Sequence, residues 1–185
     1  MGSLSKVQQQ LIVGCVLGDG YMRKKVNAHL QITHSIKQKE YVDWKYANLR
    51  NIVLTPPKVY MGNAKRIGYR FFTRSLPCLT TFYDMFYRKG VKMVPENLIL
   101  SPLSLAVWYM DDGSKSRKAS YLNCQQFDPI SQSNLLETLA RIGILASLNK
   151  DKTYSRIYIS YSYTPILVNM IKRYIVPSMR YKLSI

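Results

Sequence analysis

The chain has 185 residues, of which 47% are hydrophobic, so it can build a packed core and is not a disordered protein. It carries 27 Lys and Arg against 10 Asp and Glu, and a net charge of +17 favours a polyanionic partner, above all nucleic acid. A membrane surface is the rival polyanion, but we find neither a basic amphipathic helix nor an apolar run of spanning length, and expect no membrane association.

The first half of the chain predicts the order helix, hairpin, helix, hairpin, helix. Helical spacing, strand alternation and turn residues mark these elements. The helices are expected at 6–18, 37–54 and 76–88, and the hairpins at 21–35 and at 58–61 with 69–73.

The second half repeats this order. Helices are expected at 103–111, 131–141 and 165–174, a strand region at 119–127, and a hairpin at 145–149 with 156–161. Asp19-Gly20 and Asp112-Gly113 mark matching positions 93 residues apart (112 − 19). The repeat predicts an α+β pseudo-dimer of two αββαββα halves on one chain, with residues 1–90 and 103–185 as the halves and 91–102 as the linker.

Strand alternation places cations on one face of each predicted sheet. Arg70 and Arg74 share a face with Phe72, while Arg156 and Tyr158 lie opposite the apolar side chains of their strand. A solvated outer face is the alternative, but the net charge favours a face that contacts DNA. The candidate DNA-binding residues are Arg23, Lys24, Lys25, Lys65, Arg66, Arg70, Arg74, Lys115, Arg117, Lys118, Lys152 and Arg156.

Two apolar helices run directly into an aspartate and a glycine. Gly14 and Gly18 lie on one helical face, where they allow a second helix to approach closely. If the two helices pack side by side, Asp19 and Asp112 meet at two negative helix ends, which is unfavourable without a cation. Each Asp-Gly alone is more typical of a turn, but the repeat favours a divalent metal bound by oxygen ligands.

Residues 12–20, 100–113 and 176–183 resemble, in this order, the signatures of the LAGLIDADG homing endonucleases, in the single-chain form with two motifs. The resemblance covers nearly the whole chain. It implies that the motif helices join two halves, each with a four-stranded antiparallel saddle in the DNA major groove. It also implies metal-dependent cutting of both strands across the minor groove, leaving short 3′ overhangs.

The resemblance assigns roles to particular residues. Asp19 and Asp112 would bind metal, with the carbonyls of Gly18 and Asp111 as further ligands; Mg²⁺ is the expected ion, and Mn²⁺ would substitute for it. The other residues placed in the active site are Lys92, Lys182 and Gln125. The two lysines would stabilise charge and orient water, or merely contact phosphate. Gln125 would position solvent, although its neighbour Gln126 is the alternative.

Asp111, His29 and His34 are considered separately from the residues assigned above. Asp111 adds a third carboxylate where the motif usually has a small residue. Its side chain has solvent, a lysine or the metal as possible partners, and we expect it to lie beside the ligands without touching metal. His29 and His34 are expected away from the motifs, in packing or DNA contact.

The expected partner is double-stranded DNA, and the protein is expected to be a monomer without an obligate protein partner. An intron-splicing maturase, with intron RNA as a partner, and a non-cleaving DNA-binding protein are the alternatives on the same scaffold. The N-terminal residues show no targeting signal. This fits synthesis inside a mitochondrion or chloroplast, with a prokaryotic cytoplasm as the alternative.

Overall fold

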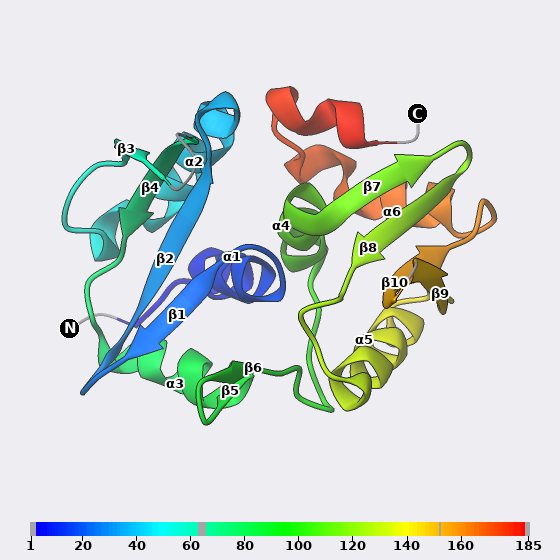
Figure 1. The fold of residues 1–185 in the computed structure, drawn as a ribbon, viewed down its shortest axis with the longest axis horizontal. Coiled ribbons are helices and arrows are strands. Elements are labelled where there is room, and N and C mark those ends of the chain that lie inside the picture. The colour runs from blue at the N-terminus through cyan, green and yellow to red at the C-terminus, as the bar shows by residue number, and fades with distance from the viewer. Residues whose placement is uncertain (1–2, 63–65, 152, 184–185) are drawn as a thin grey trace.

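A computed structural model describes residues 3–62, 66–151 and 153–183. Two central helices are flanked by two four-stranded antiparallel sheets (Figure 1). The first half comprises α1 (Lys6–Leu17), β1 (Tyr21–Lys24), β2 (Ala28–Ser35), α2 (Lys39–Leu49), β3 (Lys58–Met61), β4 (Ile67–Phe72) and α3 (Pro77–Phe86). Two 3-10 turns, η1 (Ile36–Gln38) and η2 (Arg50–Ile52), bracket α2.

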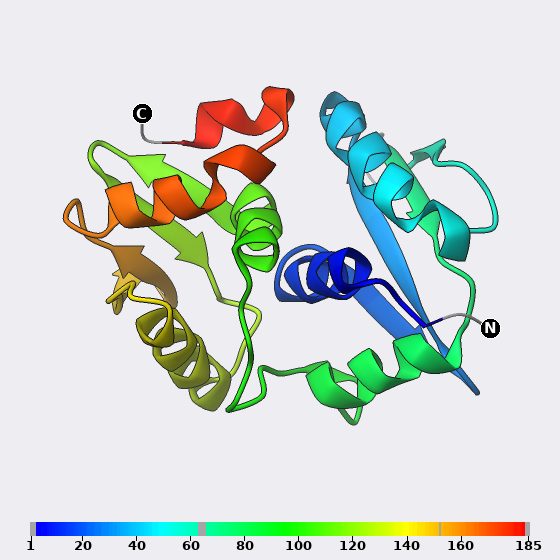
Figure 2. The same ribbon diagram turned by 180° about the vertical axis from the view of Figure 1, so that it is seen from behind.

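The second half repeats the arrangement. It comprises α4 (Pro102–Asp112), β7 (Gly113–Ser116), β8 (Ala119–Asn123), α5 (Pro129–Arg141), β9 (Ser147–Asp151), β10 (Tyr154–Ile159) and α6 (Thr164–Ile171), followed by η4 (Lys172–Tyr174) and η5 (Pro177–Lys182). The sheet orders β1-β2-β4-β3 and β7-β8-β10-β9 are the same. Seen from behind, α2 and α6 lie over the strands of their own sheets (Figure 2). The predicted α+β architecture of two similar halves is confirmed.

Helices α1 and α4 pack against each other because two glycines leave room for the neighbouring helix. A Cβ atom on Gly14 would lie 2.6 Å from both Ser104 O and Val107 Cβ. A Cβ atom on Gly18 would lie 2.5 Å from Asp111 Cβ. The predicted close approach of the two helices is therefore observed, and it places their C-terminal ends side by side (Figure 1).

Several element boundaries differ from the sequence expectation. The third helix ends at Phe86 rather than at residue 88, because Tyr87–Arg88 (β5) pairs with Val91–Lys92 (β6) in a short hairpin. Lys89 and Gly90 have φ angles of 50° and 79°, the left-handed pair that a two-residue hairpin turn requires. Strand β6 thus lies within the segment expected as a linker.

The helix expected at 37–54 is broken into η1, α2 and η2, and β8 ends at Asn123 rather than at residue 127. The last hairpin is also shifted: β9 begins at Ser147 and β10 at Tyr154. Within the described ranges, no helix has both the length and the apolar character needed to cross a membrane.

Candidate functional site

The two acids of the repeated motif lie at the ends of the central helices. Gly18 caps α1 immediately before Asp19, and Asp112 is the last residue of α4. Burial raises the pKa of Asp112 to about 7, and the charges of Asp19 and Asp111 add to that rise. The pKa of Asp19 is raised by burial and then by Asp111, although half of its side-chain surface is exposed. Both acids therefore belong to one cluster of negative charge.

A lysine lies against each of the two helix ends. Lys92 Nζ donates to Gly18 O at 2.9 Å and to Gly20 O at 3.0 Å. Lys182 Nζ donates to Met110 O at 2.5 Å and to Asp111 O at 2.9 Å. Burial lowers the pKa of both lysines, against the opposing effect of the nearby acids.

The two carbonyls expected as metal ligands, those of Gly18 and Asp111, thus accept hydrogen bonds from these lysines. Each lysine places a positive charge at a negative helix terminus, which is the favourable arrangement with the helix dipole. Lys92 binds the C-terminal end of α1 and Lys182 binds that of α4, so the same contact occurs in both halves.

The glutamine at this site is Gln126. Its Nε2 donates to Leu17 O at 3.0 Å and lies 3.4 Å from Asp112 Oδ2. Gln125 is exposed, and its amide is directed to Asn123 Oδ1 at 3.5 Å. Of the two neighbours weighed from the sequence, Gln126 is the one in contact with the acid pair, and Gln125 is not.

Asp111 takes part in a buried network of charged and polar groups. Its Oδ1 accepts from Lys45 Nζ and from Tyr41 Oη, each at 2.8 Å, and its Oδ2 accepts from the Asp19 backbone N–H at 3.1 Å. The Lys45 and Asp111 side chains are both 0% exposed. Of the partners left open for Asp111, a lysine is the one observed.

The charges of this pair stabilise each other. Burial would raise the pKa of Asp111, but Lys45 and smaller contributions from its other partners outweigh burial and lower that pKa. Burial would lower the pKa of Lys45, and Asp111 and its neighbours outweigh that effect and raise it. Both groups are therefore ionised inside the protein.

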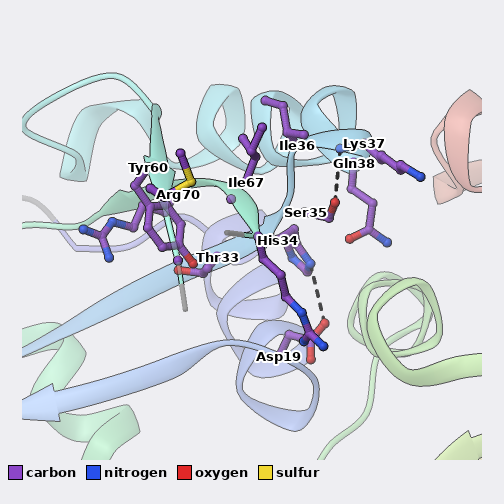
Figure 3. A pocket seen from close by; sticks show the side chains of 14 residues that line it. Asp19, Thr33, His34, Ser35, Ile36, Lys37, Gln38, Tyr60, Ile67 and Arg70 are labelled. Carbon is purple, nitrogen blue, oxygen red and sulfur yellow. Dashed lines mark hydrogen bonds and ion pairs between the residues drawn. The ribbon is translucent and has the colours of Figure 1, made fainter. Parts of the chain in front are cut away.

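The expectation that His34 lies away from the motifs is wrong. The end of β2 passes beside the C-terminal end of α1, so His34 Nδ1 is 3.5 Å from Asp19 Oδ2 (Figure 3). Its Nε2 is 3.0 Å from Lys45 Nζ. The pKa of His34 is lowered to about 4, mainly by burial and next by the charge of Lys45. The imidazole is therefore neutral at neutral pH.

Among the described residues, ligand atoms of Asp19, His34 and Asp111 lie within 4.8 Å of one another. The Lys45 ammonium is hydrogen-bonded to two of these three groups, so a cation already neutralises this cluster. The carboxylates of Asp19 and Asp112, with raised pKa values and hard oxygen donors, fit a divalent cation better.

Two arginines on the sheets stack on aromatic rings. Arg70 Cζ lies 4.1 Å from the centroid of the Tyr60 ring, and Arg156 Cζ lies 4.5 Å from that of Tyr121. A groove of about 1110 Å³ extends from Asp19 and His34 to Tyr60 and Arg70, so it connects the acid site with the surface of the first sheet (Figure 3).

The other candidate DNA-binding cations lie mostly at the surface. Lys24 is paired with Asp84 at 2.7 Å. Lys65 and Lys152 fall outside the described residues. The remaining candidates are exposed: Arg23, Lys25, Arg66, Arg74, Lys115, Arg117 and Lys118.

Sequence reasoning missed Lys45, Tyr41 and the position of His34. A signal for two of them was present, because Tyr41 and Lys45 are spaced i, i+4 on the buried face of α2 together with Val42 and Leu49. A lysine on such a face needs a buried acid, and Asp111 was the acid without an assigned partner. For His34 the local sequence carries no comparable signal.

Several known proteins are similar to this chain in sequence or in structure. Residues 9–167 match the sequence model described as the LAGLIDADG DNA endonuclease family. The probable intron-encoded endonuclease 1 of Wickerhamomyces canadensis is 29% identical over 98% of this chain and 85% of its own length. The cytochrome b mRNA maturase bI2 of Saccharomyces cerevisiae is 30% identical over 100% of this chain, which spans 49% of the maturase. Among solved structures, the homing endonuclease I-WcaI bound to its DNA recognition sequence has a TM-score of 0.91 at 25% identity, covering 99% of this chain and 88% of that one.

Proposed function

Because this chain belongs to the LAGLIDADG DNA endonuclease family, we propose that it is a site-specific homing endonuclease. It cuts both strands of a long double-stranded DNA target with a divalent metal and leaves short 3′ overhangs. The observation that carries this proposal is the junction of α1 and α4. There Asp19 and Asp112 meet between two sheets that present cations, and each helix end carries a lysine.

Each half contributes one acid and one lysine to this centre. Asp19 and Asp112 would hold Mg²⁺, or Mn²⁺ in its place, and the cation would supply Lewis-acid chemistry at the scissile phosphate. Lys92 and Lys182 place positive charge beside the scissile phosphates, where charge increases during the reaction. Gln126, whose amide reaches Asp112, orients the attacking water.

The sheets position the target. Their stacked arginines and exposed cations neutralise phosphates and contact bases, so that one scissile phosphate of each strand reaches one end of the acid pair. The solved DNA complex of I-WcaI supports this docking, because its fold matches nearly the whole chain. We propose that the protein acts as a monomer, since one chain already contains both halves. The curated relatives above are yeast proteins; we propose an organellar location, with a prokaryotic cytoplasm as the alternative.

Asp19→Asn and Asp112→Asn test the proposed chemistry. Each variant should bind the target DNA at least as tightly as the wild type but cleave it at least about 100-fold more slowly, because the metal loses a charged ligand. The readout is single-turnover cleavage of a target found by selection from a randomised DNA library, with and without EDTA. Asp84→Asn, a surface acid, is the control and should cleave normally. Cleavage by both motif variants at the wild-type rate would contradict the metal assignment.

A maturase is the second candidate function, because the related yeast maturase aligns with the entire chain. A maturase would bind an intron RNA and increase its splicing rate. Measuring cleavage of DNA and splicing of the host intron with the same preparation separates the two activities. Splicing stimulation without any DNA cleavage, in the presence of Mg²⁺, would replace the endonuclease proposal.

A further inference from the structure

His34 lies beside Asp19, and its two ring nitrogens face different partners. Nε2 of His34 faces the Lys45 ammonium at 3.0 Å, and Nδ1 faces Asp19 Oδ2 at 3.5 Å. Gln38 also lies near the ring, and its contribution raises the pKa of His34. An ammonium group has only donors, so Nε2 faces Lys45 as an acceptor without a proton, and the ring proton is then on Nδ1. Nδ1 is 3.5 Å from the Asp19 carboxylate, so its proton lies on the side of the ring that faces this acid (Figure 3).

This tautomer is set by groups that cannot easily move. Lys45 is fully buried and is bound to Asp111, which also accepts from Tyr41 Oη. The other oxygen of Asp111 accepts from the backbone N–H of Asp19. Asp111 therefore restrains Asp19 in two ways. It accepts a hydrogen bond from the Asp19 main chain, and it contacts the Asp19 side chain indirectly through Lys45 and His34.

The corresponding position in the second half is not a histidine. Tyr21 and Ser114 lie two residues after their motif acids and pair with Gln31 and Tyr121 respectively, so Gln31 corresponds to Tyr121. Three residues further along each strand, His34 corresponds to Cys124. The Cys124 thiol is buried and donates to Ser155 O at 3.4 Å. The side chain directed at Asp112 is that of Gln126 instead.

We propose that His34 is a positioning residue for Asp19, held in the Nδ1–H tautomer by the Lys45–Asp111 pair, and that it makes the two strand-cutting centres unequal. This inference rests on the proposed nuclease function. It differs from a role as a metal ligand, because an Nδ1 that carries a proton has no lone pair for a metal.

The tautomer can be measured without any cleavage. The chain contains only two histidines, so ring ¹⁵N chemical shifts can be assigned by comparing the wild type with His34→Gln. The inference predicts a neutral His34 with its proton on Nδ1, both before and after addition of Mg²⁺. A proton on Nε2, or its transfer there when Mg²⁺ is added, would identify Nδ1 as an acceptor or ligand and overturn the inference.

The strand inequality is measured by single-turnover cleavage of a target labelled separately on each strand. His34→Phe keeps the ring volume but removes both nitrogens, and it should slow one strand about 10- to 100-fold more than the other, so that nicked DNA accumulates. His34→Gln retains a donor and an acceptor and should restore most of the lost rate. Tyr69→Phe, on the strand residue paired with His34, is the control and should leave the strand ratio unchanged.

The two proposals fail in different ways. If the wild type cuts neither strand, the nuclease function fails, while the tautomer measurement still tests the position of the His34 proton. If the wild type cuts both strands and folded, DNA-binding His34→Phe slows them equally or not at all, only the role of His34 fails. Folding is checked by thermal melting and DNA binding by titration in EDTA. Failure of His34→Gln to recover the rate, in a folded protein, would also contradict a positioning role.

Discussion

The charge of Asp111 is balanced by a single residue from another helix. Lys45 and Asp111 are both inaccessible to solvent and 2.8 Å apart, so neither charge has water as an alternative partner. Removing one member of such a pair leaves the other charge buried and uncompensated, which costs far more than the net contribution of the intact pair. This pair explains how a third carboxylate is tolerated beside Asp19 and Asp112.

Lys45→Met should therefore lower the free energy of unfolding by about 3–5 kcal/mol. Urea denaturation followed by circular dichroism measures the change. Lys39→Met is the matched control, because Lys39 lies on the same helix in an exposed pair with Asp43 at 2.5 Å and should cost less than about 1 kcal/mol. The double variant Lys45→Met, Asp111→Asn should recover much of the loss. Equal effects of Lys45→Met and Lys39→Met would contradict the buried pair.

Asp112 makes stability depend on pH in the absence of divalent metal. Its pKa in the folded protein is about 7, above the ordinary value of 3.8, so the folded state keeps a proton that the unfolded chain has already lost. Stability should therefore fall as the pH rises from about 4 to about 7 and change little from this group above that.

Asp112→Asn should reduce this fall and raise the melting temperature of the metal-free protein at pH 8. Mg²⁺ should then raise the melting temperature of the wild type more than that of the variant, because it neutralises the same charge. Differential scanning calorimetry from pH 4 to pH 8, with and without Mg²⁺, measures both effects. The raised pKa of Asp112 would be contradicted if the wild type were less stable at pH 4 than at pH 8 and the variant showed the same difference.

At the scale of the elements, the two sheets present equivalent arginines. Arg70 pairs with Thr33 across the first sheet, and Arg156 pairs with Asn123 at the same register of the second. Tyr60 packs closely against Gly68, where a Cβ atom would be 2.2 Å from its ring, and Arg70 lies over the same ring. The stacked guanidinium is planar and restrained, which suits bidentate recognition of a base edge.

Arg70→Lys keeps the charge but loses the planar, stacked group. We expect it to relax sequence preference at one base-pair position of the target by about 1–3 kcal/mol, with a smaller change in overall affinity. Cleavage of a library of single-base target variants measures this preference. Arg74→Lys is the control, since Arg74 lies beyond the end of β4 and is exposed. An equal loss at every position would mean that Arg70 contacts only phosphate.

On the scale of the whole molecule, the positive charge is unevenly divided. Residues 1–92 contain 16 Lys and Arg against 4 Asp and Glu, whereas residues 93–185 contain 11 against 6. Net charges of +12 and +5 indicate that the first half contributes more of the attraction to phosphate. DNA affinity should fall steeply with salt. The logarithm of the binding constant should fall by about 0.9 for each neutralised phosphate when the logarithm of the salt concentration rises by one.

Neutralising exposed cations in each half tests this division. Replacing Arg23 and Lys25 by Gln should reduce non-specific DNA binding and its salt slope, because two phosphate contacts are lost. The corresponding change of Lys115 and Lys118 in the second half is the comparison. Fluorescence anisotropy with a non-specific duplex at several salt concentrations measures both slopes. A flat salt response of the wild type would rule out a DNA-binding surface formed by these sheets.

The repeated architecture and the acid pair could be predicted from local patterns in the sequence. Helical spacing, strand alternation and the two Asp-Gly marks are local patterns, and they led directly to two matching halves joined through close-packed helices. Gly14 and Gly18 could be interpreted in the same way. Two glycines on one apolar helix face indicate that another backbone or side chain lies close to that face. The lysines needed more than a local pattern, because the resemblance to a family supplied Lys92 and Lys182.

The other side chains around the acids could not be predicted before the packing of the elements was known. A strand end and two helices that are remote in the chain contribute His34, Lys45 and Asp111. No periodicity in the sequence indicates that these residues lie together. The choice between Gln125 and Gln126 depended on the backbone direction where β8 ends, and a one-residue difference there turns a side chain towards Asp112 or towards Asn123. Local patterns report which face of an element is buried, whereas contacts between elements depend on packing that the whole chain determines together.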